Sequence, residues 1–138
     1  MIIRTLRRFI KAQEKDFYKA YIEIKYQQKK VNHWIWYIFP QLEDLGYSEM
    51  AKYYGLKNFK EAKRYYKNKT LRKNLLDITK ALLEIDKPIS EIVGIIDAKK
   101  IQSCMTLFYE VSNEEIFKKV IDKFYNGEED ENTLRIIG

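Results

Sequence analysis

The stretch Asn32-His33-Trp34-Ile35-Trp36-Tyr37-Ile38-Phe39-Pro40-Gln41 decides how this chain folds. Between Trp34 and Phe39 it is apolar on every side. A surface helix carries one apolar stripe, whereas a helix that is apolar all round lies in the interior. The segment Met105–Tyr109 is nearly as apolar. We therefore predict an all-α fold in which two central buried helices are wrapped by amphipathic helices.

Outside these two segments, apolar residues recur every three or four positions, which predicts helices rather than strands. The N-terminal stripe forms either one helix or two, with a break near 13–16 and Asp16 as the N-cap of the second. Its members are Leu6, Phe9, Ile10, Gln13, Phe17, Ala20, Tyr21 and Ile24.

Polar side chains ahead of apolar stripes mark helix starts, and glycine or proline marks helix ends. The expected starts are Asn32, Ser48, Asn58, Thr70, Asp97 and Ser112, where Asn58 with Glu61 and Ser112 with Glu115 resemble capping boxes. The expected ends lie before or at Pro40, Gly55, Pro88 and Gly127, and the tail 133–137 is expected to form a turn or a helix.

Length and composition indicate one domain covering residues 1–138, which is long enough to bury a core. With one cysteine, Cys104, and one histidine, His33, the chain can form neither an internal disulfide nor a Cys/His zinc set. We predict Cys104 to be a buried apolar group and predict no metal or cofactor site. The sequence shows neither a signal peptide nor a membrane-spanning run, so we expect a cytoplasmic protein without membrane contact.

The net charge of +6 suggests a nucleic-acid partner. However, lysine outnumbers arginine twenty to six, and lysine, isoleucine, tyrosine and asparagine are all abundant, as in proteins of AT-rich genomes. Sites built to bind phosphate often use arginine, because its planar fork contacts two oxygens. The charge alone therefore indicates no partner.

One segment, 52–73, concentrates this charge and interleaves it with tyrosines. Basic groups alternating with aromatic rings are typical of grooves that bind single-stranded nucleic acid. The other interpretation is a solvated lysine-rich face, which we favour. The residues that would contact nucleic acid are Lys60, Lys63, Arg64 and Lys67, and the tyrosines interleaved with the basic residues of the segment are Tyr53, Tyr54, Tyr65 and Tyr66.

The run 33–41 and five further motifs together resemble the uncharacterised family catalogued as domain of unknown function 1810. The motifs are Arg8-Phe9-x-x-Ala12-Gln13, Leu45-Gly46-x-Ser48, Glu61-Ala62-x-x-Tyr65, Asp97-x-x-Lys100 and Ser103-x-Met105-Thr106-Leu107-Phe108. The resemblance covers nearly the whole chain in order and implies a multihelical fold with two buried central helices. Some members carry the name calpastatin, but calpastatin inhibitory segments are disordered and this chain is apolar and compact, so that name carries no weight.

Two positions depart from the family pattern. Where the family usually has Gly-x-Arg-Leu, this chain has Arg72-Lys73-Asn74-Leu75, so any contribution of that arginine to a shared site is in doubt here. Cys104 stands where the family commonly has a second serine.

Seven side chains form the candidate ligand site. Aromatic rings suit stacking on a flat ligand, amides suit hydrogen bonding, and cations suit an anionic group. Histidine is the usual general base in proteins, so His33 would be the general base of any reaction, with Asp97 as its orienting partner. The structural interpretation assigns these groups to the core, to helix ends or to surface ion pairs. The seven are Arg8, Gln13, His33, Trp36, Gln41, Tyr54 and Lys100.

Three hypotheses follow for function. The leading one is a pocket for a small anionic or nucleotide-like ligand, with catalysis left open. The second is an adaptor that binds nucleic acid or an acidic protein through segment 52–73. The third is a purely structural or interaction module. The sequence does not decide among them and gives no oligomeric state.

Overall fold

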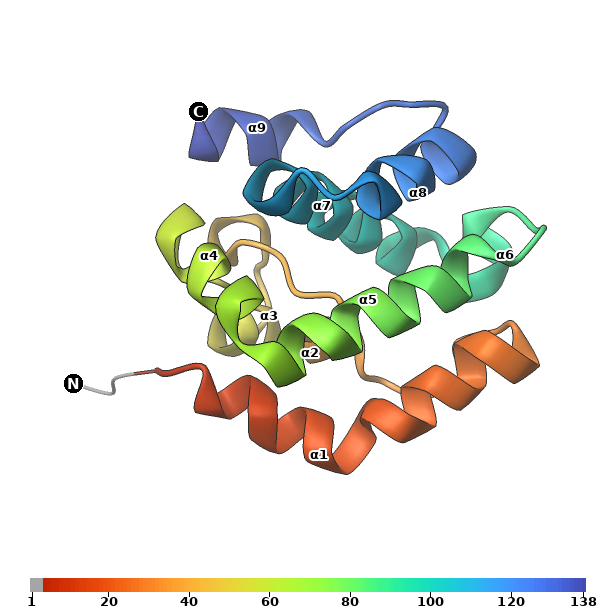
Figure 1. The fold of residues 1–138 in the computed structure, drawn as a ribbon, viewed down its shortest axis with the longest axis horizontal. Coiled ribbons are helices and arrows are strands. Elements are labelled where there is room, and N and C mark those ends of the chain that lie inside the picture. The colour runs from red at the N-terminus through yellow and green to blue at the C-terminus, as the bar shows by residue number, and fades with distance from the viewer. Residues whose placement is uncertain (1–3) are drawn as a thin grey trace.

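A computed structural model describes residues 4–138, and this part of the chain is all-helical, with only an isolated bridge between Leu42 and Leu56. Its helices form three layers, with α1 on one side, α4 and α5 in the middle, and α7 to α9 on the other (Figure 1). Their bounds are α1 Arg7–Ile22, η1 Glu23–Gln27, α2 Ile35–Ile38, η2 Glu43–Leu45, α3 Glu49–Tyr54, α4 Phe59–Lys67, α5 Lys69–Leu83, α6 Ile89–Val93, α7 Ile95–Ser112, α8 Glu115–Tyr125 and α9 Glu131–Ile137.

The two central apolar segments lie in the core, which confirms the prediction from the sequence. In the first, α2 is a single turn because Pro40 follows closely, and Trp36 alone between Trp34 and Phe39 is partly exposed. In the second, all of Met105–Phe108 is inaccessible to solvent in the middle of α7. Helices α4, α6, α8 and α9 pack around α7. Cys104 is buried with them, and burial raises the pKa of its thiol.

Of the two alternatives for the N-terminal stripe, the structure has the one without a break near Gln13 to Asp16, because α1 is continuous there. Helix α1 continues into the π-helical turn η1 and ends at Gln28, which adopts a left-handed conformation. Asp16 is not an N-cap, and its carboxylate instead accepts a hydrogen bond from the Tyr37 hydroxyl. The side-chain partner of Asp16 thus lies 21 residues away in α2.

A buried carboxylate, Glu23, fixes the chain between η1 and α2. It accepts hydrogen bonds from Val31 N at 2.6 Å, Asn32 N at 3.0 Å, Asn32 Nδ2 at 2.6 Å and Trp34 Nε1 at 3.0 Å. Burial raises the pKa of Glu23, but these hydrogen bonds outweigh it and hold the pKa below its ordinary value. Asn32 was expected to cap α2; that prediction is wrong, because its amide is used by Glu23 and Trp34 occupies the N-cap position.

Two of the expected helix starts are confirmed. The Ser48 hydroxyl accepts from Ala51 N and starts α3, which ends at Gly55. The Asn58 side chain accepts from Glu61 N and starts α4. A Cβ at Gly55 would lie 2.4 Å from the Cα of Glu43, so only glycine allows the chain after α3 to pass this close to η2.

Three other expected starts are wrong. Asn68, not Thr70, caps α5 by accepting from Leu71 N, and it is also the C-cap of α4. Asp97 lies in the first turn of α7, whose N-cap is Gly94 with φ +88°, a value that favours glycine. Ser112 is the last residue of α7, and its hydroxyl donates to Phe108 O instead of forming a capping box with Glu115.

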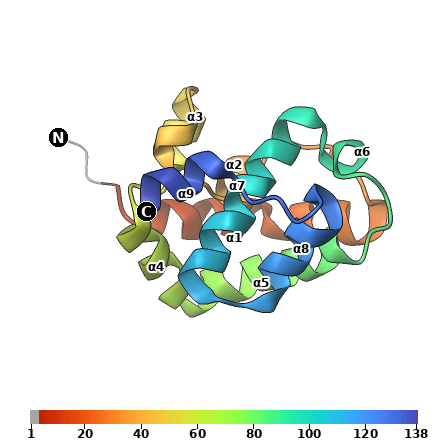
Figure 2. The same ribbon diagram turned by 90° about the horizontal axis from the view of Figure 1, so that it is seen from above.

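The tail forms the short helix α9, capped by the Asp130 side chain, which accepts from Thr133 N. Helix α9 packs against α7 (Figure 2). Within residues 4–138, no helix is long and apolar enough to cross a membrane. No cluster of His, Cys, Asp or Glu side chains in this range could hold a metal ion.

Candidate ligand groove

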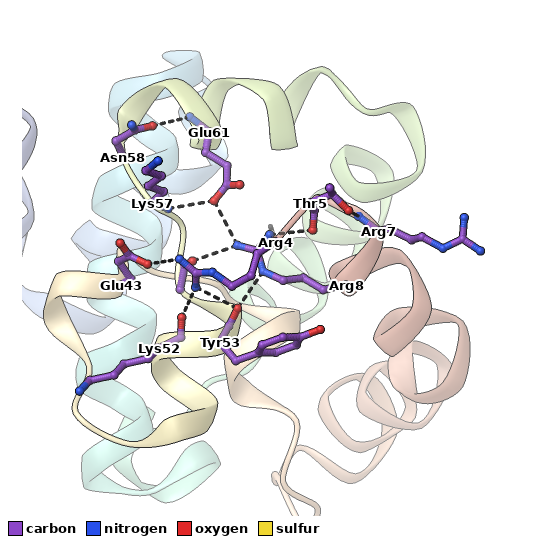
Figure 3. Close-up of polar contacts among 11 residues, drawn as sticks. Arg4, Thr5, Arg7, Arg8, Glu43, Lys52, Tyr53, Lys57, Asn58 and Glu61 are labelled. Atoms are coloured by element: carbon purple, nitrogen blue, oxygen red, sulfur yellow. Dashed lines mark hydrogen bonds and ion pairs between the residues drawn. The ribbon is translucent and has the colours of Figure 1, made fainter. Parts of the chain in front are cut away.

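The structure separates the predicted site residues into a buried hub and a surface groove. In the hub, which comprises Arg8, Gln13, Glu61, Tyr65 and Asn74, the Arg8 guanidinium of α1 is almost fully enclosed. It donates to the backbone oxygens of Thr5 at 2.7 Å, Tyr53 at 2.8 Å and Gly55 at 3.0 Å (Figure 3). It also forms a 3.1 Å ion pair with Glu61. Arg8 thus holds the end of α3 against the start of α4.

One carboxylate oxygen of Glu61 accepts two hydrogen bonds, one from the Arg8 guanidinium and one from Lys57 N at 2.9 Å (Figure 3). Burial raises its pKa, but the hydrogen bond from Arg8 and the one from Lys57 outweigh burial and lower the pKa below the ordinary value. In the usual capping box this side chain would accept from the backbone N–H of the N-cap residue. Here it accepts instead from the residue before the N-cap and from a distant arginine.

Gln13, another hub residue, also has its side-chain polar atoms in hydrogen bonds. Its amide nitrogen donates to Tyr37 O at 2.8 Å and to the Tyr65 hydroxyl at 3.0 Å, and its oxygen accepts from Asn74 Nδ2 at 2.9 Å. Asn74 is the position where the family usually has arginine, and here it contributes to the hub. Arg8 and Gln13 therefore connect α1 to α2, α4 and α5 and offer little to a ligand.

Tyr54 lies beside the hub in an aromatic cluster. Its ring centroid is 4.9 Å from those of Tyr37 and Tyr53 and 6.0 Å from that of Phe9. Such tilted and edge-on arrangements are favourable ring packing. Burial is the main cause that raises the pKa of its hydroxyl. Its position favours packing over ligand stacking.

His33 is exposed, and within residues 4–138 its side chain forms no hydrogen bond or ion pair. The structure therefore does not pair it with Asp97. The Asp97 carboxylate instead lies 2.9 Å from Lys30 Nζ and 3.6 Å from Lys100 Nζ. His33 as a general base stays a prediction without an orienting group.

Of the remaining predicted residues, Gln41 and Lys100 line a groove of about 630 Å³ between the start of α7 and the chain from Gln41 to α3, and Trp36 lines a small cavity beside it. This size is typical of small-molecule sites. The exposed surface of its wall is mainly apolar, although many of the lining residues carry a polar group. The lining residues are Gln41, Leu45, Gly46, Tyr47, Ser48, Ala51, Ile95, Ile96, Lys99, Lys100, Ser103, Asp130 and Asn132.

Three apolar side chains at the groove are unusually exposed. Tyr47 is 91% exposed, Ile95 81% and Ile96 74%. Water contact at large apolar side chains costs free energy, and contiguous apolar surface often marks an interaction site. This exposed apolar surface had a signal in the sequence. Two adjacent isoleucines follow Gly94 in a segment that is otherwise rich in charged residues.

Trp36, Gln41 and Lys100 meet at the inner end of the groove. They line a small cavity of about 10 Å³ that shares Gln41, Ala51 and Lys100 with the groove. The Lys100 ammonium lies 5.6 Å from the centroid of the Trp36 ring. The Trp36 indole N–H is buried without a hydrogen-bond partner, and the Gln41 side chain makes no hydrogen bond within the described chain. These groups keep unused hydrogen-bonding capacity.

Asp130, which sequence reasoning missed, holds the outer edge of the groove. It is nearly inaccessible and accepts from the Ser103 hydroxyl at 3.0 Å and the Thr133 hydroxyl at 2.6 Å. Lys99 Nζ lies 3.7 Å from its other oxygen. The spacing of Asp130 and Thr133 is that of a helix N-cap.

The basic residues of the alternative site lie together on α4. Lys60, Lys63, Arg64 and Lys67 are all exposed, and none belongs to an ion pair within residues 4–138. The two interleaved rings of α4 do not lie on this exposed surface, because Tyr65 is fully buried and Tyr66 packs on Phe108 and Phe117.

Fold and groove together define a small multihelical protein built around two central apolar segments. A protein-family model described as a protein of unknown function, DUF1810, matches residues 4–137, and the chain belongs to this family. The chain is also similar to a solved structure, the conserved hypothetical protein Rv1873 from Mycobacterium tuberculosis. The TM-score is 0.93 at 33% sequence identity, covering 96% of this chain and 95% of that one. No curated protein matches the chain.

Proposed function

We propose that the protein binds a small anionic ligand with an aromatic or apolar body in the groove between Gln41–Ala51 and Ile95–Ser103. One observation carries this proposal: a cavity of about 630 Å³ combines exposed apolar walls with Lys99 and Lys100. An apolar pocket with a few convergent polar groups is the usual form of a ligand site. Nucleotide-like molecules belong to this class, and no catalytic step is part of the proposal.

The inner end of the groove supports the same proposal. Within residues 4–138 the buried Trp36 N–H has no hydrogen-bond partner and the Gln41 side chain forms no hydrogen bond, and the Lys100 ammonium lies near the Trp36 ring. Buried polar groups are normally hydrogen-bonded, so an unpartnered donor beside a cavity suits a ligand atom or a bound water.

The test is a thermal-shift screen of nucleotides, dinucleotides and small organic acids. A ligand present at 100 times its dissociation constant stabilises the folded state by about 2.7 kcal/mol. Ile96→Asp adds a negative charge at the groove and should abolish the shift. Tyr18→Asp is the matched control, because Tyr18 is equally exposed but lies on α1. Absence of any shift with the wild-type protein would refute the proposal.

A second candidate function is binding of nucleic acid along α4. Four unpaired cations recur at i, i+3, i+4 and i+7, which places them on one face of the helix. Because Tyr65 and Tyr66 are committed to the core, this face would bind phosphates without stacking bases.

Fluorescence anisotropy with a labelled single-stranded oligonucleotide, measured over a range of salt concentrations, tests this candidate. Reversing Lys60, Lys63 and Arg64 to Glu should weaken binding and reduce the salt slope by about 0.7 per lost contact. The same reversal at the exposed Lys11, Lys15 and Lys19 of α1 is the control. No binding at low salt, or equal loss in both triple variants, would eliminate the α4 site.

A further inference from the structure

We propose that the groove selects a monoanion, a carboxylate on an apolar acyl or aryl body, and disfavours polyphosphates. This inference rests on the proposed function and narrows it to one class of ligand. It depends on the balance of charge in the groove, on which lysine donors remain free, and on the apolar walls.

The groove carries one excess positive charge. The charged residues in its lining are Lys99, Lys100 and Asp130. Behind them, Lys30 and Asp97 form a close pair at 2.9 Å that adds no net charge. Asp97 also lies in the first turn of α7, where its carboxylate offsets the positive end of the helix dipole. A ligand with one negative charge would neutralise this site, whereas a triphosphate would leave several charges unpaired in a partly apolar setting.

The two lining lysines are only loosely held. Lys100 lies 3.6 Å from Asp97, and Lys99 lies 3.7 Å from Asp130. Charge-assisted hydrogen bonds between ammonium and carboxylate are typically about 2.7–2.9 Å long. Lys30 makes the close contact to Asp97, so Lys100 keeps ammonium donors for a ligand carboxylate. No arginine lines the groove, and its cations therefore lack the planar fork that suits phosphate.

The apolar walls define the other part of the ligand. Leu45, Ala51, Ile95 and Ile96, with the ring of Tyr47, line the space next to the lysines. Each methylene group buried there should tighten binding roughly fourfold until the groove is filled. Affinity should thus rise with the length of an acyl chain while the charge requirement stays constant.

The test compares hexanoate with three molecules of related structure and with ATP. Butyrate is shorter, hexanamide is neutral, hexyl phosphate can carry a second charge, and ATP is a polyphosphate. Dissociation constants come from titration calorimetry, and amide shifts of Lys99–Ser103 in ¹H–¹⁵N NMR spectra locate the binding. We expect hexanoate to bind at least tenfold tighter than hexanamide and roughly 16-fold tighter than butyrate. We expect ATP to bind most weakly.

Lys100→Met should bring the affinities for hexanoate and hexanamide close together, and Lys80→Met on α5, an exposed position outside the groove, should leave them unchanged. If ATP or hexyl phosphate binds at the groove more tightly than hexanoate, the monoanion inference is wrong and the proposed function stands. If hexanamide equals hexanoate in the wild-type protein, the charge selection is refuted and the groove is an apolar site. If none of the five molecules shifts the groove amides, both proposals fail.

Discussion

The hub and the groove contain the same kinds of side chain, but they use them differently. In the hub, the Arg8 guanidinium has three backbone oxygens and a carboxylate as partners, and the Gln13 amide makes three hydrogen bonds. In the groove, Lys100 has one long ion pair and the Trp36 N–H has no partner. Unused hydrogen-bonding capacity therefore distinguishes a candidate binding residue from a structural one better than residue type does.

The largest effect should come from Trp34→Ala. Trp34 is buried and its indole donates to Glu23, so the variant leaves a cavity and removes a bond to a buried carboxylate. We expect a loss of about 3–5 kcal/mol in the free energy of unfolding, measured by urea denaturation. Trp36→Ala, at the groove, should lose clearly less. Equal losses would mean that the groove residue is part of the core.

Arg8→Met should cost about 3 kcal/mol in the same measurement, because it leaves the buried Glu61 without its cation. Removing both charges in Arg8→Met/Glu61→Gln should recover part of this loss. A cost below about 1 kcal/mol for Arg8→Met would show that the hub is not the tight connection between α1 and α4 described above.

The two glutamines give a matched comparison. Gln13→Leu leaves Tyr37 O, the Tyr65 hydroxyl and Asn74 without a partner and should cost about 1–3 kcal/mol. Gln41→Leu removes no side-chain hydrogen bond and should change stability by less than about 0.5 kcal/mol. The distinction between hub and groove would be refuted if Gln41→Leu were the more damaging change.

Acid should weaken the Glu23 contacts. The pKa of Glu23 is lower in the folded state than its ordinary value of 4.5, so the ionised form stabilises the fold. This contribution is complete above about pH 4.5 and is lost as the pH falls through the folded-state pKa. Denaturation curves recorded from pH 7 to pH 3 should therefore show a smaller decline for Glu23→Gln than for the wild type. Parallel declines would contradict the role assigned to Glu23.

A small effect on stability should come from Lys100→Met. Its partly exposed ion pair with Asp97 contributes about 0–1 kcal/mol at most, and Lys30 continues to pair with Asp97. The same variant should alter ligand binding strongly. A destabilisation above about 2 kcal/mol would place Lys100 among the structural residues of the hub.

Much of the fold could be predicted because it depends on local pattern. The apolar character of Trp34–Phe39 placed α2 in the core, and Ser48 and Asn58 were recognised as caps from their own neighbourhoods. Predictions failed where two neighbours could serve equally, as with Asn68 and Thr70. They also failed where a side chain bonds to a group outside its own segment, as the Asn32 amide donates to Glu23.

The candidate site, like the fold, could be predicted only where local pattern decides the position of a residue. Trp36, Gln41 and Lys100 lie together at the small cavity beside the groove. Arg8 and Gln13 do not, because all their partners except Thr5 O come from positions 24 to 61 residues away, which no local pattern shows. The surroundings of His33 could not be predicted, because a single histidine before a helical turn occurs at exposed and at buried positions.

Asn68 ends α4 and begins α5, so the two helices meet at a corner that has no connecting residues to absorb a change in length. An extra residue inserted after Asn68 would turn the following helix by about 100° about its own axis. The stripe of Leu71, Leu75, Ile78 and Leu82 would then face water instead of the interior. We expect this corner to tolerate substitutions better than insertions or deletions.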